Sequence, residues 1–143
     1  IGDGNYKNKI SKVIKDYNLQ KEVSLLGFVS NTNPYLQHCD VFTLTSPIEG
    51  FGIVYLEAMQ YKKVCISSTN CGSEDVVLNN KTGYSVEPND IKGLIKVICE
   101  IISNKKYSEK LGKNGYYHFV QNFTFSKFKK NQLRLLKGVK SEL

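Results

Sequence analysis

A strand, a loop and a helix decide the fold. They are Val41-Phe42-Thr43-Leu44, then Thr45-Ser46-Pro47-Ile48-Glu49-Gly50-Phe51-Gly52, and then a helical run to about Tyr61. The first stretch is short and apolar, as a buried strand is, whereas the last has the length of a helix. The two glycines allow the backbone to bend between them. Free backbone amides at the start of the helix, with the helix dipole behind them, predict an anion site there.

Short apolar runs alternate with segments of helical period along the rest of the chain. The predicted strands cover residues 23–26, 41–44, 64–66 and 84–86, and the predicted helices cover 6–17, 33–38, 53–61, 74–78, 91–102, 107–120 and 126–137. This alternation indicates β-α-β units, so we expect an α/β domain with a parallel sheet. In such a sheet, ligands bind at the carboxyl ends of the strands.

Two of the predicted helices show a clear apolar face. Asn89-Asp90 predicts a cap for the helix at 91–102, with the apolar residues Ile91, Leu94, Ile95, Ile98 and Ile102 on one side. The last helix has an apolar stripe of Phe125, Phe128, Leu135 and Val139. We expect both faces to pack against other parts of the protein.

Length and composition limit the classes of protein. With 143 residues and 41% hydrophobic content, the chain predicts one domain over residues 1–143. Charge interrupts every apolar run before it reaches the length of a membrane span, so we expect a soluble, cytoplasmic protein. No signal peptide opens the chain, and Ile1-Gly2-Asp3-Gly4 resembles the end of a strand that meets a turn. We expect the true N-terminus to lie upstream.

The four cysteines do not indicate a metal site or a disulfide framework. Cys39, Cys65, Cys71 and Cys99 form no C-x-x-C pair, and the two histidines lie at no zinc-ligand spacing from them. Small buried side chains in a reducing cytoplasm are the favoured interpretation.

The charge is +7 and collects near the C-terminus. The cationic residues there are Lys127, Lys129, Lys130, Arg134, Lys137 and Lys140, with no acid before Glu142. A solvated helix face is the favoured interpretation, and peripheral contact with an anionic membrane is the next. Nucleic acid is the weakest partner, because no base-stacking surface lies among these residues.

Two acids flank the start of the central helix. Glu49 and Glu57 are eight residues apart, which would be about 12 Å if all eight were helical. Carboxylates accept hydrogen bonds from hydroxyls, so one acid could hold a sugar and the other a ribose, with phosphates between them. On spacing alone, however, a glycine loop before an ordinary solvated helix is the better interpretation.

The order of motifs changes that interpretation. The run from Ser46 through Glu57-Ala58-Met59 resembles the E-x7-E signature of a large family of retaining glycosyltransferases of the GT-B type. Other segments match in order along nearly the whole chain: Gly2-Asp3-Gly4, Val23 to Gly27 with Phe28-Val29, Cys39-Asp40-Val41-Phe42, Gly72 with Glu74, Gly83-Tyr84, Pro88-Asn89-Asp90 and Phe123-Thr124-Phe125. The resemblance implies a Rossmann-like parallel sheet with helices on both faces, the C-terminal half of a GT-B enzyme.

The resemblance also implies roles for single residues. Glu49 corresponds to the acid that contacts the donor sugar, and Glu57 to the acid that binds the ribose. Gly50, Phe51, Gly52 and Ile53 would supply backbone amides near the sugar and phosphate, and Val29 lies where family members meet the base. The donor is a nucleoside diphosphate sugar, and no cofactor or metal is implied.

The chain departs from the family pattern in three respects. Lys62-Lys63-Val64 stands where members usually carry Gly-x-Pro, and the Gly-rich turn at Cys71-Gly72-Ser73 is shortened. The strand and helix that precede Gly2 in the family, and the N-terminal domain that binds a glycan or lipid-linked acceptor, are absent. We therefore expect the fragment alone to be inactive. A non-catalytic module that binds nucleotide sugars, and a general phosphate-binding α/β domain, remain the alternatives.

Overall fold

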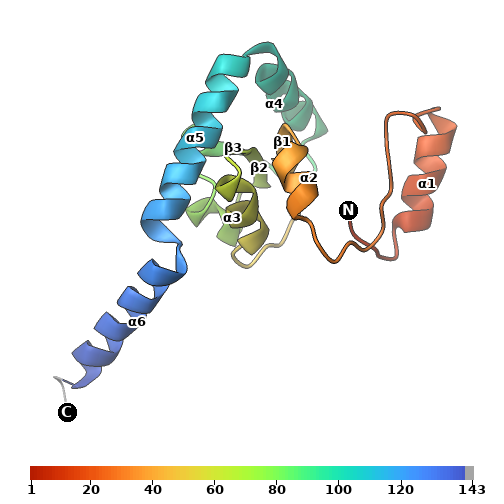
Figure 1. Cartoon of the computed structure of the whole chain (residues 1–143). Helices are drawn as coiled ribbons and strands as arrows, with labels where there is room; N and C mark the ends of the chain where they lie inside the picture. The colour runs from red at the N-terminus through yellow and green to blue at the C-terminus, as the bar shows by residue number, and fades with distance from the viewer. Residues whose placement is uncertain (141–143) are drawn as a thin grey trace. The chain divides into compact units, whose positions relative to one another are not determined.

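The structure is a computed structural model that describes the backbone of residues 1–140 and the side chains of residues 1–136. Figure 1 shows the elements along the chain. The chain divides into two compact units, Ile1–Pro34 and Tyr35–Leu143. The single domain expected over residues 1–143 stays a prediction.

The first unit contains helix α1, Lys7–Asp16, close to its predicted bounds. Gly27 has a φ of 67°, and its carbonyl accepts a hydrogen bond of 2.7 Å from the amide of Gly2. The strand predicted at residues 23–26 is wrong, because this segment lacks the row of backbone hydrogen bonds that defines a strand in the described residues.

The second unit is built on a parallel sheet of three strands in the described residues. They are β1 (Val41–Thr43), β2 (Val64–Ser68) and β3 (Gly83–Val86), in the order β1-β2-β3. Ile66 pairs with Thr43 on one side and with Tyr84 on the other. Because the strands are parallel, their following loops meet at one edge of the sheet.

The helices follow the predicted order with small changes of bounds. They are α2 (Asn33–His38), α3 (Ile53–Gln60), the 3₁₀ turn η1 (Gly72–Asp75), α4 (Ile91–Ser103), α5 (Lys105–Asn122) and α6 (Phe125–Lys140). The carboxylate of Asp90 accepts a hydrogen bond of 2.9 Å from the amide of Gly93, which confirms the predicted cap of α4. The short helix predicted at 74–78 is instead η1, which begins and ends earlier.

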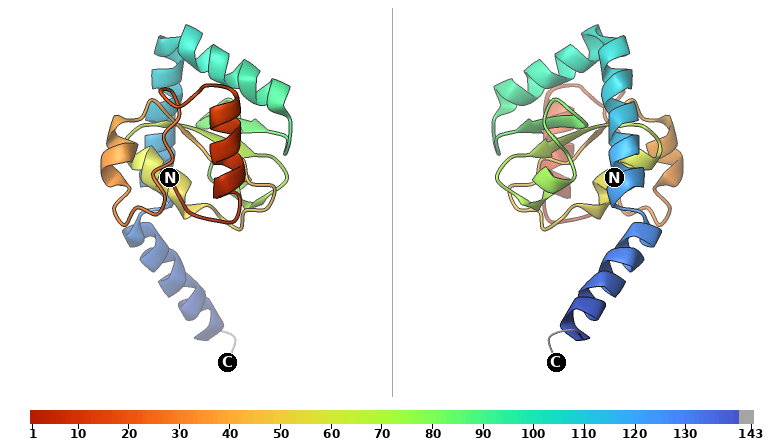
Figure 2. Two further views of the ribbon diagram at one scale, coloured as in Figure 1. Left: turned by 90° about the vertical axis from the view of Figure 1, so that its right-hand side faces the viewer. Right: turned by 90° about the vertical axis from the view of Figure 1, so that its left-hand side faces the viewer.

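Helices cover both faces of the sheet (Figure 2). Successive side chains of a strand point to opposite faces. Accordingly Cys65 packs in a core with α3 and with Val76 and Val77, which follow η1, whereas Val64 and Ile66 pack in a second core with α4. Helix α5 contributes Leu111 to the second core and Phe119 to the edge of the first. The α/β prediction with helices on both faces is therefore confirmed.

The predicted apolar face of α4 is only partly correct. Leu94, Val97, Ile98 and Ile101 face the core, whereas Ile91, Ile95 and Ile102 are 70%, 55% and 74% exposed. The helix carries apolar residues over more than half of its circumference, so the sequence pattern did not fix which arc is buried.

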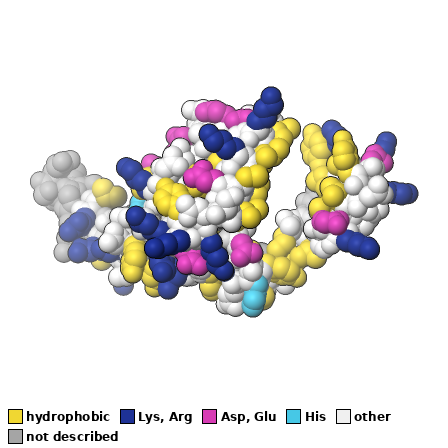
Figure 3. Space-filling model, turned by 90° about the horizontal axis from the view of Figure 1, so that it is seen from above, with side chains coloured by type: hydrophobic (Ala, Val, Ile, Leu, Met, Phe, Trp, Pro, Cys, Tyr) yellow, Lys and Arg dark blue, Asp and Glu magenta, His cyan; other side chains and the backbone are white. Residues whose placement is uncertain are grey.

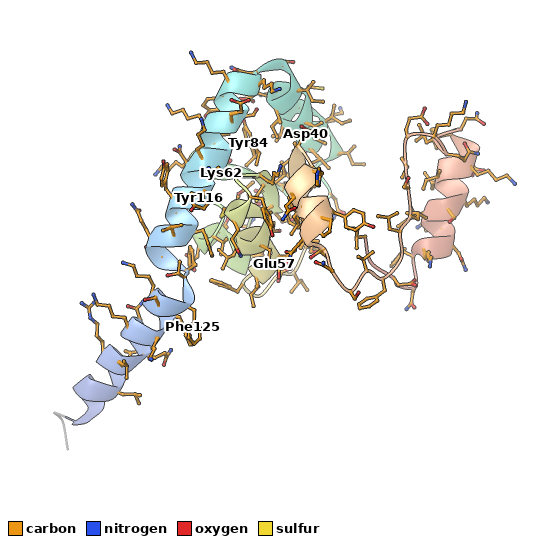
Figure 4. All side chains as sticks on the ribbon, viewed as in Figure 1. Asp40, Glu57, Lys62, Tyr84, Tyr116 and Phe125 are labelled. Atoms are coloured by element: carbon orange, nitrogen blue, oxygen red, sulfur yellow. The ribbon has the colours of Figure 1, made fainter. Side chains whose placement is uncertain are left out.

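The departure at Lys62 falls on a special backbone position. Lys62 has a φ of 57°, the left-handed region that favours glycine. Its carbonyl packs against α5 so closely that a Cβ on Gly112 would lie 2.1 Å from the oxygen. Its ammonium lies 5.2 Å from the centre of the Tyr116 ring, a cation–π contact (Figure 4). The family glycine at this position therefore has a conformational reason, and this chain places a lysine in the same conformation.

Candidate functional site

The loop at residues 44–52 leads from the carboxyl end of β1 to the start of α3. The loop after β2 lies beside it, because β1 and β2 are parallel neighbours. The amide of Gly72, at the start of η1, donates a hydrogen bond of 2.8 Å to the carbonyl of Glu49. The two loops are thus joined at the sheet edge where ligands of α/β proteins bind.

Gly72 lets the two loops approach closely. A Cβ on this residue would lie 1.5 Å from the carbonyl oxygen of Gly50, a separation that no side chain allows. The loop at residues 44–52 therefore depends on a glycine in the loop after β2. From the sequence, Gly72 is only a part of the family pattern, and no contact is predicted for it.

Glycine is required at position 52 for two reasons. Gly52 has a φ of 78°, and a Cβ there would lie 2.4 Å from the ring of Tyr55. At Gly50 neither reason applies, because its φ is not in the left-handed region and a Cβ would meet nothing within 4 Å. The expectation that both glycines provide the bend is confirmed for Gly52 and is wrong for Gly50.

Tyr55 holds the start of α3 in place. Its side chain is fully buried, its hydroxyl donates a hydrogen bond of 2.5 Å to the carbonyl of Leu44, and its ring meets Phe42 edge-on. Burial, with a smaller contribution from the nearby Glu49 carboxylate, raises the pKa of Tyr55 to about 12. Sequence reasoning missed this residue, since nothing in its apolar helix distinguished it from an ordinary core aromatic.

The N-terminus of α3 is uncapped in the described residues. Gly52 occupies the N-cap position and has no side chain to accept from the helix amides. The first amides of a helix have no partner within the helix, so those of Ile53 and Val54 are left for a ligand or water. Negative charge is stabilised at such an end.

The two predicted acids lie on either side of this helix start. The Glu49 side chain is half-buried, and its Cγ lies 3.4 Å from the position that a Cβ on Gly52 would take. Glu57 is also half-buried and lies on α3 one turn after the exposed Ile53 (Figure 4). Among the described residues the structure gives neither carboxylate a hydrogen-bond or ion-pair partner.

The expected spacing of the acids needs one correction. Helix α3 begins at Ile53, so Glu49 lies in the loop and only the last four steps to Glu57 are helical. The helical part advances about 6 Å instead of the 12 Å that eight helical residues would give. The structure brings Glu49, Gly50, Phe51, Gly52 and Ile53 together around the helix start, with Glu57 farther along α3.

Val29 belongs to the first unit, where it is half-buried two residues after Gly27. The other predicted site residues belong to the second unit. A role for Val29 at the base of a nucleotide therefore stays a prediction.

Known proteins resemble this chain in sequence and in fold. The chain is 27% identical over 124 residues to poly(ribitol-phosphate) alpha-N-acetylglucosaminyltransferase of Staphylococcus aureus (strain COL), with 86% of this chain and 25% of that protein covered. It is 33% identical over 106 residues to UDP-Gal:alpha-D-GlcNAc-diphosphoundecaprenol alpha-1,3-galactosyltransferase of Escherichia coli, with 73% of this chain and 27% of that protein covered.

A solved structure shows the same fold. A mutant of S. aureus TarM, in complex with fondaparinux, alpha-GlcNAc-glycerol and UDP, matches with a TM-score of 0.83 and 26% identity, over 92% of this chain and 27% of that chain. This chain thus spans about a quarter of the length of each of these proteins. Residues 1–118 match the family described as Glycosyl transferases group 1. The chain belongs to the group 1 glycosyl transferases.

Proposed function

We propose that this chain is the donor-binding part of a retaining glycosyltransferase of the E-x7-E type. It binds a nucleoside diphosphate sugar where the loop at residues 44–52 meets the N-terminus of α3. The complete protein transfers the sugar to a glycan or lipid-linked acceptor, which an N-terminal domain outside this chain holds. One observation carries the proposal: an uncapped helix start lies between two carboxylates that have no partner in the described residues.

Each part of the donor has a matching group. The free amides of α3 suit the diphosphate, because they donate hydrogen bonds at the positive end of the helix dipole. Glu49 lies beside the helix start, where its carboxylate can accept hydrogen bonds from sugar hydroxyls. Glu57 lies one turn into the helix and suits the ribose.

Transfer breaks the bond between the anomeric carbon and the phosphate oxygen, and the electron pair stays on the nucleoside diphosphate. A hydroxyl oxygen of the acceptor forms the new bond to the anomeric carbon, and its proton passes to the departing diphosphate. Amides that already point to this oxygen stabilise the charge that develops. Holding donor and acceptor together provides a second part of the rate increase. Retention of anomeric configuration and independence of metal ions belong to the proposal. Transfer that continues in the presence of a chelator would support the second point.

The relatives support the choice of substrates. One is named for UDP-Gal and a diphosphoundecaprenol-linked acceptor, and another for poly(ribitol-phosphate). The TarM mutant contains UDP. We therefore favour a nucleoside diphosphate sugar as donor and a glycan or lipid-linked chain as acceptor.

Ligand-dependent thermal unfolding tests the donor site. UDP-galactose, GDP-mannose, UDP and UMP are compared for the shift that each produces in the melting temperature of this chain. At least one sugar nucleotide should stabilise the chain more than UMP does, since stabilisation follows affinity for the folded state. No shift with any of these compounds would contradict the proposal.

The main alternative is a module that binds nucleotide sugars without catalysis. It predicts the same thermal shifts, so the full-length protein must be assayed for transfer from the donor that binds. Transfer supports the enzyme, whereas binding without transfer or donor hydrolysis supports the module.

A second part of the proposal concerns location at the cytoplasmic face of a membrane. None of the helices in the described part of the chain is long and apolar enough to cross a bilayer. Helix α6 instead presents exposed apolar residues, including Phe125, Phe128 and Leu135, together with basic ones. Figure 3 shows the two kinds of side chain next to one another at this end of the chain. Val139, Lys137 and Lys140 of the predicted pattern lie outside the described side chains. Such a surface can bind anionic lipid headgroups.

A further inference from the structure

We infer that His118 and Phe123 are positioning residues for the loop at residues 44–52, called the donor loop below. This inference rests on the proposed function. Neither residue lies next to the motif in sequence, and neither belongs to the predicted site. Both belong to a closed series of contacts in the second unit that begins and ends at the loop.

The first contact joins two aromatic rings. Phe51, between the two motif glycines, meets Phe123 with ring centres 5.7 Å apart and planes at 67°. Phe123 follows the last residue of α5, and its amide donates a hydrogen bond of 2.8 Å to the carbonyl of Phe119. Edge-to-face rings at this separation attract one another in addition to burying apolar area. The loop is thereby fastened to the end of α5.

The second contact joins Phe123 to His118. The ring of His118 lies 5.1 Å from that of Phe123, with planes at 76°. The side-chain amide of Asn122 lies 3.1 Å from Nδ1 of His118 and 3.0 Å from the carbonyl of the same residue. If Asn122 donates to Nδ1, then Nε2 carries the hydrogen of the neutral ring.

The third contact closes the series. Nε2 of His118 lies 3.2 Å from the carbonyl of Asp75, so the ring donates to that oxygen. Asp75 is the last residue of η1, and Gly72 is the first. Gly72 in turn donates to the carbonyl of Glu49 and packs on Gly50. The loop is therefore held at Glu49 through η1 and at Phe51 through Phe123, and His118 joins the two supports.

This arrangement predicts a specific role. The supports fix the backbone of residues 49–51, whereas Glu57 is fixed by α3 itself. Loss of His118 or Phe123 should loosen the part of the site assigned to the sugar and leave the ribose acid in place. The effect should be larger on a sugar nucleotide than on UDP.

Hydrogen exchange of the full-length protein without ligand tests the positioning role. In Phe123→Leu and His118→Ala, the amides of Gly72 and Tyr55, which donate hydrogen bonds to the carbonyls of Glu49 and Gly52, should exchange about threefold to tenfold faster, as expected for the loss of one ring contact. Peptides from β2 and from the second half of α3 should be unchanged. His118→Gln should restore much of the protection, because its amide can still donate to Asp75. Tyr117→Leu is the control, since Tyr117 is an exposed ring on the same helix.

Two outcomes would overturn the inference. One is unchanged exchange of the Gly72 and Tyr55 amides in both variants, and the other is an equal rise throughout the second unit, which would mean general destabilisation. A double variant Phe51→Leu/Phe123→Leu adds a check: it should exchange no faster than the worse single variant, because both remove the same contact.

Binding separates this inference from the proposed function. Calorimetry of the full-length protein with UDP and UDP-galactose should show a larger loss for UDP-galactose than for UDP in Phe123→Leu. If the wild type binds neither compound nor any other sugar nucleotide, the proposed function fails, whatever the exchange result. If the wild type binds and the variants bind equally well, the inference alone fails.

Discussion

The donor loop is fixed by contacts within the molecule, whereas helix α6 exposes its side chains. The loop at residues 44–52 is held by close backbone contacts at Gly52 and Gly72, while the carboxylate of Glu49 has no partner among the described residues. In α6 the side chains of residues 125–136 are all exposed, with Phe125 at 79% and Leu135 at 65%. The loop is therefore fixed by contacts within the molecule and leaves the Glu49 carboxylate available to a ligand, whereas α6 exposes both its apolar and its basic side chains.

This difference separates two kinds of functional surface. In the loop, the backbone geometry depends on Gly52 and on residues outside the loop such as Gly72 and Tyr55, so substitutions there should change folding and binding together. In α6, the side chains of residues 125–136 are exposed, so substitutions should leave folding unchanged and alter only contacts with something else.

The largest effect should come from Gly52→Ala. The new Cβ would require a left-handed backbone from alanine, which costs about 1 kcal/mol or more, and would press on the buried Tyr55 ring, which costs about 1 to 3 kcal/mol. We expect a loss of about 3 kcal/mol in the free energy of unfolding, measured by chemical denaturation. Gly50→Ala is the matched control, and its unfolding should stay within about 0.5 kcal/mol of the wild type. Equal losses in the two variants would show that the loop is not fixed at Gly52.

Tyr55 should make stability depend on alkaline pH. Its folded pKa of about 12 exceeds the value of about 10 expected in the unfolded chain. Its contribution is complete below about pH 10 and is lost as the pH rises through 12, by about 2 to 3 kcal/mol. Tyr55→Phe should lose about 1 kcal/mol at pH 7 with the Leu44 hydrogen bond, and should lack this slope. When the free energies of unfolding of the wild type and of Tyr55→Phe are plotted from pH 7 to 12, the two curves should therefore cross. Parallel curves would contradict the raised pKa of the buried Tyr55.

The sequence predicted the donor loop well because its signals are local. The strand, the glycine at position 52, the helix start and the acids Glu49 and Glu57 all lie within 17 residues of one another. The same holds for the cap of α4, where Asp90 and Gly93 are three residues apart. Signals of this kind depend on chain geometry over one or two turns, which a single sequence contains.

The contacts that hold the loop could not be predicted in the same way. Gly72 meets Gly50 and Phe123 meets Phe51 across 22 and 72 residues of sequence, and only the folded sheet brings them together. The predictions of the buried face of α4 and of a strand at residues 23–26 were wrong for a related reason. Periodicity gives the type of an element, but its partners decide which face is buried and whether a run of apolar residues becomes a strand.

Glu57→Gln should weaken donor binding and leave folding unchanged. A charge-assisted hydrogen bond to ribose hydroxyls would become a neutral one, so we expect a loss of about 1 to 3 kcal/mol in the free energy of UDP binding. Calorimetric titration of the full-length protein measures this loss. Glu109→Gln is the control, because Glu109 is an exposed acid on α5 at the opposite edge of the sheet. Equal affinity of Glu57→Gln and the wild type would return Glu57 to an ordinary solvated helix face.

The smallest single effects should occur on α6, where each basic residue near an anionic membrane contributes about 1 kcal/mol. Sedimentation with vesicles measures this binding: the full-length protein should pellet with anionic vesicles and not with neutral ones, and high salt should release it. Helical spacing places Lys129 beside the exposed Phe125, and Lys127 on the opposite side of α6. If the apolar face of α6 contacts the lipid, Lys129 is therefore closer to the headgroups than Lys127 is. Lys129→Gln should therefore weaken pelleting about fivefold at unchanged folding, and Lys127→Gln should weaken it less. Equal pelleting with anionic and neutral vesicles would contradict binding to an anionic membrane. An equal loss of vesicle binding in the two variants would mean that α6 contributes only a diffuse positive charge.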